Sequence, residues 1–287
     1  MALETVTSVE HLRSAVADAR RANRTIGFIP TMGALHAGHV SLFEASRRNN
    51  DFTIVSIFVN PTQFGPGDDF DRYPRTLDAD RAICDAAAAQ VLFVPQHEDV
   101  YPKGDQTRVR PGPLADGLCG PFRPGHFEGV CTVVAKLFGL VQPDVAYFGQ
   151  KDAQQVAIIR RMVVDLRMPL RIEACPIVRE PDGLALSSRN AYLEPDQRRP
   201  SLCLYQALTT GRDMLRAGES VNDAVAAMRE RLERTSGVSV DYVSVVDPDS
   251  LDPVTDTKSR LMVAGAIRIG SCRLIDNVLM DLSVDRE

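Results

Sequence analysis

The sequence predicts an α/β fold: a Rossmann-like, doubly wound parallel sheet followed by a smaller α+β C-terminal domain. Three observations support this prediction. Through the first two thirds of the chain, apolar β-branched segments alternate with segments of helical periodicity. The apolar segments lack polar alternation, as is typical of strands buried on both faces. After Pro176 helices are followed by strands, so we expect domains at 1–177 and 178–287.

The elements follow from these patterns in order. The expected strands of the parallel sheet are 25–30, 52–59, 91–94, 144–148 and 170–175. The expected helices that alternate with them are 8–23, 38–49, 77–90, 129–141 and 151–166. For the C-terminal domain, helices are expected at 195–217 and 221–235, and strands at 238–246 and 261–269. Pro200 lacks a backbone donor, and it should kink the first of these two helices or delay its start.

Composition excludes several classes of protein. The 287 residues are 44% hydrophobic and 25% charged, which is ordinary for a globular chain. The net charge of -5 indicates no nucleic-acid partner, since such proteins usually carry a basic face. No apolar run approaches the roughly 20 residues of a membrane helix. We see no signal peptide and therefore expect a cytoplasmic protein. The six cysteines form no C-x-x-C pair, so we expect reduced, mostly buried thiols.

The first candidate site is PTMGALHAGH at 30–39, where a buried strand ends and a helix begins. His36 and His39 are three residues apart and share a helical face. A helix N-terminus attracts anions, and imidazoles there can stabilise the charge of phosphoryl or nucleotidyl transfer. An equally weighted alternative is that the histidines only cap or solvate the helix. Zinc binding is weaker, because no H-E-x-x-H motif is present.

Two further segments suit a nucleotide. FGQKDAQQ at 148–155 places Lys151 and Asp152 after a strand, where an ammonium suits phosphates and a carboxylate suits ribose hydroxyls. REPDGLALSSRN at 179–190 holds hydroxyls and an arginine in a turn of the kind that closes over phosphates. Each also has a plain structural interpretation, a helical first turn for the former and a solvated linker for the latter.

Together these stretches resemble the pantothenate synthetase (pantoate–β-alanine ligase) family. The resemblance covers residues 25 to about 193, in the family's order, and rests on PTMGALHAGH at 30–39, FVNPTQF at 58–64, YPRT at 73–76, RPGHFEGV at 123–130, PDVAYFGQKDAQQ at 143–155 and DGLALSSRN at 182–190. It implies a homodimer that uses ATP and Mg²⁺ to join pantoate to β-alanine, through a pantoyl adenylate, in coenzyme A biosynthesis.

The resemblance also implies roles for matching residues. The nucleotide signature and the phosphate-facing set comprise His36, His39, Lys151, Ser187, Ser188 and Arg189. Gly149 and Asp152 are implied near the ribose, and Met32 and Val178 near the nucleotide. Gln63 and Gln155 are implied to hold pantoate, with Arg123 and His126 in support. Asp80 is the nearest equivalent of a family magnesium ligand, on a loose local match.

Two other functions remain open from the residues. One is another adenylyltransferase of the same superfamily, which moves AMP onto a phosphate ester or an amino acid. A phosphate substrate would favour additional cations over Gln63 and Gln155. The other is a catalytically silent nucleotide-binding protein on this fold. The presence of His36, His39 and Lys151 argues against the silent protein.

Overall fold

The computed structural model describes residues 3–256 and 260–282, and the chain divides into two compact units. Unit 1 comprises Met1–Gly112, Arg123–Gly149 and Ile158–Pro176. Unit 2 comprises Pro113–Phe122, Gln150–Ala157 and Ile177–Glu287. The expected domain boundary between residues 177 and 178 lies one residue after the start of the longest segment of unit 2, Ile177–Glu287. The two short segments of unit 2 precede this boundary in the sequence.

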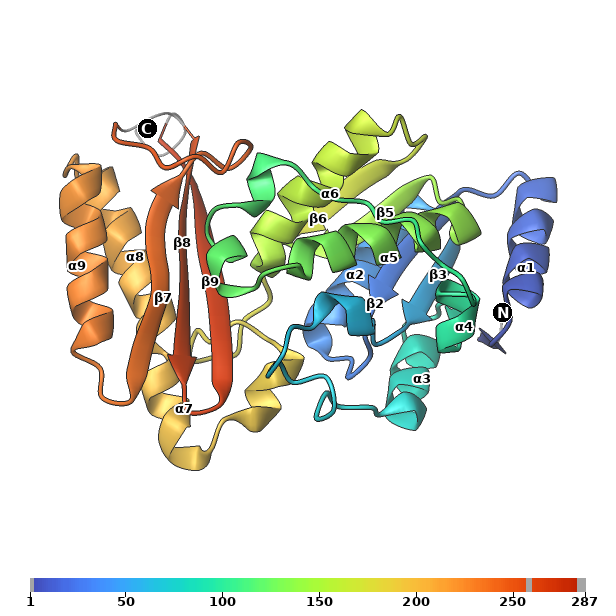
Figure 1. Ribbon diagram of the computed structural model, residues 1–287, viewed down its shortest axis with the longest axis horizontal. Helices are drawn as coiled ribbons and strands as arrows, with labels where there is room; N and C mark the ends of the chain where they lie inside the picture. Colours follow the sequence, from blue (N-terminus) through green and yellow to red (C-terminus); the bar gives the residue numbers. More distant parts are fainter. Residues whose placement is uncertain (1–2, 257–259, 283–287) are drawn as a thin grey trace. The chain divides into compact units, whose positions relative to one another are not determined.

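Unit 1 contains a sheet of six parallel strands in the order β1-β4-β3-β2-β5-β6. Figure 1 labels β2, β3, β5 and β6 of this sheet. The strands are β1 (Glu4–Val6), β2 (Ile26–Thr31), β3 (Phe52–Ile57), β4 (Val91–Phe93), β5 (Val145–Gly149) and β6 (Arg171–Cys175). Strand order reverses between β2 and β5, which is the topological switch point of a doubly wound sheet. The predicted α/β fold is therefore confirmed. β1 was not predicted, because three residues are too few to show a periodicity.

Helices lie on both faces of this sheet. They are α1 (Val9–Arg21), α2 (Ala37–Asn49), α3 (Leu77–Ala86), α4 (His97–Val100), α5 (His126–Val141) and α6 (Ala153–Asp165). Side chains of α2 and α3 share a buried cluster with alternate residues of the strands, such as Ile29 and Val55. On the opposite face, Phe138 of α5 meets Phe28 of β2 and Phe148 of β5 edge to face. Period-two alternation thus buries both sides of each central strand.

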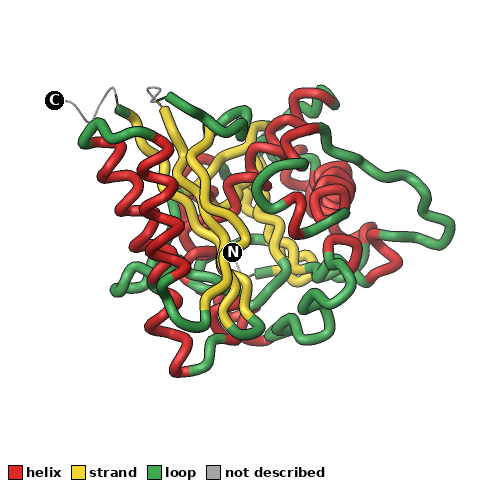
Figure 2. The backbone as a smooth tube through the Cα atoms, turned by 60° about the vertical axis from the view of Figure 1, so that its left-hand side comes forward, coloured by secondary structure: helices red, strands yellow, loops and turns green. Residues whose placement is uncertain are grey.

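Unit 2 is built on an antiparallel sheet in the order β7-β8-β9. Its strands are β7 (Val238–Val246), β8 (Arg260–Ile269) and β9 (Cys272–Asp281), and its helices are α7 (Pro195–Ser201), α8 (Cys203–Arg216) and α9 (Val221–Glu233). The tube view shows helices lying along this sheet (Figure 2). Val263 and Ile267 of β8 pack with α8 and α9, while Met262 and Ala264 pack with Leu114 and Leu118 on the other face.

Two local departures from prediction have simple causes. The strand β9 was not predicted, although it pairs with β8 through a tight turn at Gly270, whose φ is +55°. The helix expected at 195–217 is interrupted at Leu202, just after Pro200, so that α7 and α8 are separate. Pro200 lies inside α7, two residues before this interruption, where it supplies no backbone N–H to the helix. Among the described residues, no helix has the length and apolar character that a membrane crossing requires.

Candidate functional site

The turn after β2 carries the first candidate residues in a conformation that needs support. Gly33 and Ala34 have φ values of +84° and +51°. Glycine adopts this left-handed region freely, whereas alanine does so at a steric cost. Asp80 of α3 meets this turn: its Oδ1 accepts the Leu35 N–H at 2.7 Å, and its Oδ2 accepts the Ala34 N–H at 3.0 Å. The turn therefore depends on a carboxylate from a distant part of the chain.

His36 and His39 cap the helix that follows the turn. His36 is the N-cap residue of α2, and its Nδ1 accepts the Gly38 N–H at 3.1 Å. The Nδ1 of His39 accepts the His36 N–H at 3.2 Å. A neutral imidazole that accepts at Nδ1 carries its proton on Nε2. Both histidines therefore cap the helix, as the alternative interpretation expects. Because Nδ1 of each ring accepts a backbone N–H, the Nε2–H of each neutral ring is a hydrogen-bond donor.

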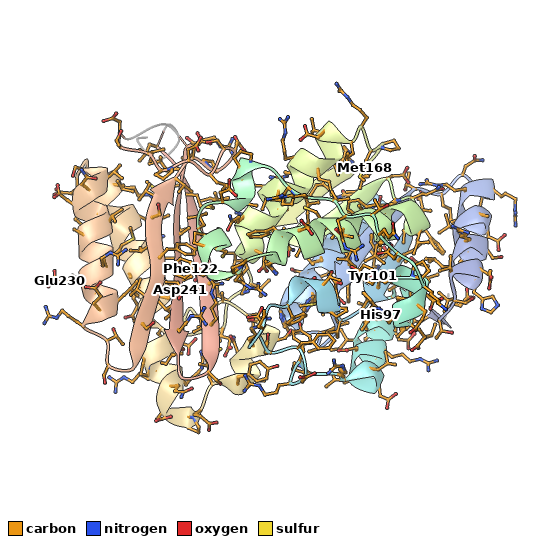
Figure 3. All side chains as sticks on the ribbon, in the orientation of Figure 1. His97, Tyr101, Phe122, Met168, Glu230 and Asp241 are labelled. Carbon is orange, nitrogen blue, oxygen red and sulfur yellow. The ribbon has the colours of Figure 1, made fainter. Side chains whose placement is uncertain are left out.

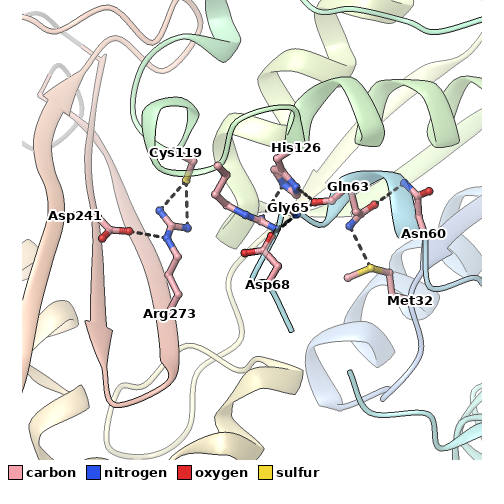
Figure 4. A network of polar contacts seen from close by, with 10 residues as sticks. Met32, Asn60, Gln63, Gly65, Asp68, Cys119, His126, Asp241 and Arg273 are labelled. Atoms are coloured by element: carbon pink, nitrogen blue, oxygen red, sulfur yellow. Dashed lines mark hydrogen bonds and ion pairs between the residues drawn. The ribbon is translucent and has the colours of Figure 1, made fainter. Parts of the chain in front are cut away.

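Gln63 lies in a buried polar cluster of unit 1, 8% exposed (Figure 4). Its Oε1 accepts from Nδ2 of Asn60 at 3.1 Å, and its Nε2 lies 3.1 Å from the Met32 sulfur. Asn60 also donates to the Gly129 carbonyl and accepts from the Tyr101 hydroxyl at 2.8 Å. The structure therefore brings Gln63 and Met32 together. Asn60 was not predicted as a site residue, although it stands within FVNPTQF at 58–64.

Arg123 and His126 support Gln63 from its backbone side. Arg123 lies 2.9 Å from Nε2 of His126, and the other ring nitrogen, Nδ1, lies 2.9 Å from the Gln63 carbonyl. Because arginine only donates, Nε2 accepts and Nδ1–H donates to the carbonyl. Arg123 also forms an ion pair with Asp68 at 3.4 Å.

In the same unit, the rings of His97 and Tyr101 stack with centroids 5.3 Å apart (Figure 3).

Lys151, Asp152 and Gln155 belong to unit 2: the first two lie in the 3-10 turn before α6, and Gln155 lies in the first turn of α6. Gly149 is the last residue of β5 in unit 1. The Lys151 ammonium lies 3.7 Å from the Asp152 carboxylate. Asn277 of β9 donates to the carbonyls of Gln150 and Lys151 at 2.9 and 3.1 Å. The short 3-10 turn Gln150–Asp152 is therefore tied to the antiparallel sheet of its own unit.

The turn with the second group of phosphate candidates also lies in unit 2. Ser187 caps the 3-10 helix Ser188–Tyr192, and its Oγ accepts the Arg189 N–H at 3.3 Å. The Leu186 N–H donates to the Val178 carbonyl at 3.0 Å, so Val178 lies beside this segment. The structure thus groups Val178 with Ser187, Ser188 and Arg189.

A buried ion pair anchors the same turn. Arg179 makes two bonds to Asp276, at 2.6 and 2.9 Å, and its guanidinium stacks 3.8 Å from the Tyr205 ring centroid. Burial raises the pKa of Asp276, and the Arg179 charge opposes that rise. Asp276 was missed because it lies in β9, the strand that was not predicted.

A second cluster of unit 2 joins Arg273 to Asp241 at 2.7 Å and to the Cys119 sulfur at 3.6 Å (Figure 4).

A magnesium role for Asp80 does not fit the geometry of this carboxylate. Asp80 is 1% exposed, and its oxygens accept bonds from Ala34, Leu35 and the Thr76 hydroxyl. Mg²⁺ requires near-octahedral oxygen ligands and usually retains several waters. Within residues 3–256 and 260–282, no group of three or more His, Cys, Asp or Glu side chains is arranged to hold a metal ion.

A doubly wound sheet with a histidine pair at the first turn of the helix after its central strand defines an α/β enzyme of the nucleotide-binding type. More particularly, the chain belongs to the pantoate-beta-alanine ligase family, whose model matches residues 4–279. It is a ligase of pantothenate biosynthesis.

Relatives and a solved structure match nearly the full length of the chain. The chain is 47% identical to pantothenate synthetase of Acetivibrio thermocellus, over 98% of this chain and 100% of the relative. It is 50% identical to pantothenate synthetase 1 of Bradyrhizobium diazoefficiens, over 98% and 99%. The crystal structure of pantothenate synthetase from Thermus thermophilus superposes with a TM-score of 0.90, at 48% identity and 96% and 98% coverage.

A second solved structure carries ligands. It is pantoate-beta-alanine ligase from Francisella tularensis, complexed with beta-gamma ATP and beta-alanine. This chain matches it with a TM-score of 0.80 and 35% identity, over 97% of this chain and 98% of that protein.

Proposed function

We propose that the chain condenses pantoate with β-alanine in two steps, through a pantoyl adenylate made from ATP. The observation that carries the proposal is the arrangement of His36 and His39. Backbone N–H groups occupy Nδ1 of both rings, so that each neutral imidazole offers Nε2–H as a donor at the N-terminus of α2. Donors fixed in advance at a helix N-terminus suit the charge that develops on a phosphate.

In the first step, a pantoate carboxylate oxygen attacks the α-phosphorus of ATP and pyrophosphate leaves. The carboxylate is ionised at neutral pH, since reference carboxyl pKa values lie near 4, so no general base is needed. The protein aligns two anions and stabilises the added charge. We assign the phosphate contacts to His36, His39, Lys151, Ser187, Ser188 and Arg189.

In the second step, the amine of β-alanine attacks the adenylate carbonyl carbon. An amide bond forms, the bond to the AMP oxygen breaks, and the amine loses a proton. AMP and pantothenate are the products. The beta-gamma ATP and beta-alanine in the complex of the Francisella relative support ATP and β-alanine as substrates of this chain.

The remaining contacts follow the family motifs. We assign Gly149 and Asp152 to the ribose, Met32 and Val178 to the nucleotide, and Gln63 and Gln155 to pantoate. Arg123 and His126 support Gln63. The resemblance to the family implies Mg²⁺ as a cofactor, and a bound Mg²⁺ would neutralise charge on the ATP phosphates.

We also propose that the enzyme is a cytoplasmic homodimer. The six cysteines support a reducing compartment, because all six side chains are buried and cytosolic thiols are kept reduced. The dimer follows from family membership, and sedimentation equilibrium measures it directly.

The decisive experiment is isotope exchange. With pantoate present and β-alanine absent, labelled pyrophosphate should enter ATP, since adenylation is reversible before the amine arrives. AMP release should then require β-alanine. Exchange that requires β-alanine, or isolation of pantoyl phosphate, would contradict the adenylate mechanism.

A further inference from the structure

Asp80 contacts two successive amides of a turn that lies far away in the sequence. The Asp80 side chain, on the first turn of α3, is 1% exposed. It accepts the Leu35 N–H at 2.7 Å, the Ala34 N–H at 3.0 Å and the Thr76 hydroxyl at 3.3 Å. The first two bonds span 45 and 46 residues of chain. Two successive N–H groups that converge on one carboxylate form an anion-binding concavity.

The backbone of this turn is strained and needs such a partner. Ala34 has a φ of +51°, in a region where a non-glycine residue persists only when its surroundings hold it. The turn also presses directly against the carboxylate, because a Cβ built on Gly33 would lie 2.9 Å from Oδ2 of Asp80. This packing places the carboxylate oxygens against backbone, without room for a hydrated ion between them.

The turn ends in the two histidines. His36 follows Leu35 directly, and its backbone N–H holds the ring of His39. A displacement of the Ala34 and Leu35 amides therefore moves both imidazoles. We propose that Asp80 is a positioning residue that clamps residues 33–35 and thereby orients His36 and His39, and that it does not ligate magnesium. The inference rests on the proposed function, in that the histidines act in adenylation.

The test compares Asp80→Asn with Asp78→Asn. Asp78 lies in the same first turn of α3 but is exposed, so the control removes the same charge from the same helix end. The amide group of asparagine has only one acceptor oxygen and cannot accept both turn amides in the same way. In Asp80→Asn, we expect single-turnover adenylation to slow by about 10- to 100-fold, the scale of a small misplacement of reacting groups. Asp78→Asn should remain within about twofold of the starting rate, because surface changes have small effects.

Two readouts separate a clamp from a ligand and from a general loss of stability. Amide hydrogen exchange over residues 33–36 should accelerate in Asp80→Asn, while peptides of β5 and of α8 keep their protection. The Mg²⁺ concentration for half-maximal rate should stay the same in both variants. A large rise in that concentration with unchanged protection of the turn would make Asp80 a metal ligand. Unchanged rate and unchanged protection would also overturn the clamp.

A milder variant covers the case in which Asp80→Asn does not fold. Thr76→Val removes one donor to Asp80 and retains the charge. It should accelerate exchange at the same turn amides, with a smaller loss of rate; no acceleration would contradict the clamp. The amide-exchange comparison does not depend on the reaction. If the unaltered protein shows no pantoate-dependent pyrophosphate exchange, the proposed function fails while the clamp is still tested.

Discussion

Hydrogen bonds to the Nδ1 atoms of His36 and His39 determine what these two side chains contribute at the residue scale. Each ring accepts a backbone N–H, from the N-cap residue or from the first turn of α2, and thereby keeps its proton on Nε2. Capping and the proposed catalytic role are therefore compatible. A variant that removes the imidazole changes both the helix terminus and the proposed phosphate donor, and experiments must separate the two.

His39→Ala should slow adenylation by about 10²–10³, the scale for losing a fixed charge-stabilising donor. It should also lower the free energy of unfolding by about 1 kcal/mol through the lost cap. His39→Asn retains a side-chain acceptor near the His36 N–H, so it should lose rate with a smaller loss of stability. Quench-flow and urea unfolding measure the two effects. A loss below about threefold in the chemical step would leave His39 as a cap only.

Lys151→Ala should show a similar loss of about 10²–10³ in adenylation, because an ammonium near phosphates stabilises developing charge. Lys103→Ala is the matched control, because Lys103 is exposed and its substitution removes the same charge from another part of the chain. Single-turnover rates compare the two. Equal rates in both variants would show that only net charge matters.

Gln63→Ala should weaken the use of pantoate by roughly 1–3 kcal/mol, the cost of a lost buried polar partner. ATP affinity should be nearly unchanged. A site that hydrogen-bonds a hydroxyl rejects analogues without it, so the preference for pantoate over a deoxy analogue should narrow. Steady-state kcat/KM for both acids, with an ATP titration, measures this. An equal loss for both acids would place Gln63 elsewhere in the mechanism.

At the scale of elements, close contact between α5 and the segment before Gln63 positions that side chain. A Cβ built on Gly129 would lie 2.3 Å from the Thr62 carbonyl oxygen and 2.6 Å from the Gln63 nitrogen. These neighbours are backbone atoms, which cannot rotate away as a flexible side chain does. The glycine therefore allows the helix to approach the loop.

Gly129→Ala should destabilise the fold by about 1–3 kcal/mol, as overpacked sites do. It should also raise the KM for pantoate, because the displaced backbone carries Gln63. Gly139→Ala is the control in the same helix: nothing lies within 4 Å of its Cβ position, and alanine should stabilise the helix by about 0.5–1 kcal/mol. Chemical denaturation of both variants measures these opposite changes in the free energy of unfolding. Equal effects would show that helix propensity alone is at work.

At the scale of the whole molecule, the burial of thiols determines their reactivity. Burial raises the pKa of Cys84 and of Cys131 to about 12, with the Asp80 charge adding to the rise at Cys84. Burial raises the pKa of Cys175 to about 11. The thiolate is the reactive form of cysteine, so these groups are poor nucleophiles at neutral pH. All six cysteines are buried, as expected, while their reduced state remains a prediction.

We predict that no cysteine is catalytic, and that a variant with all six replaced by alanine or serine according to burial keeps most of its kcat if it folds. A pantoyl thioester on any cysteine would contradict this.

The raised pKa values of the buried thiols also predict that the fold is less stable at alkaline pH. The pKa values of Cys84 and Cys131 in the folded protein exceed the unfolded value of 9.0. The contribution of these protonated thiols to the free energy of unfolding is therefore complete below about pH 9 and is lost as pH rises toward 12. Urea unfolding at pH 7, 9 and 10 measures the loss.

The sequence by itself determined the parallel sheet, most of its strands and helices, and the residues of the family motifs, because apolar runs and short motifs are local signals. Its limits are equally physical. β1 is too short to show a period, and the antiparallel partner β9 depends on pairing with β8. Asn60 and Asp276 act through contacts with residues distant in the chain.

Only the tertiary structure shows which groups Asp80 contacts. Its position after YPRT favoured a metal ligand, whereas its oxygens bind amides 45 and 46 residues away. The tautomers of His36, His39 and His126 were likewise decided by which donors the fold presents to each ring. A hydrogen bond depends on the distance and direction between two groups, and for residues far apart in the sequence folding alone determines both.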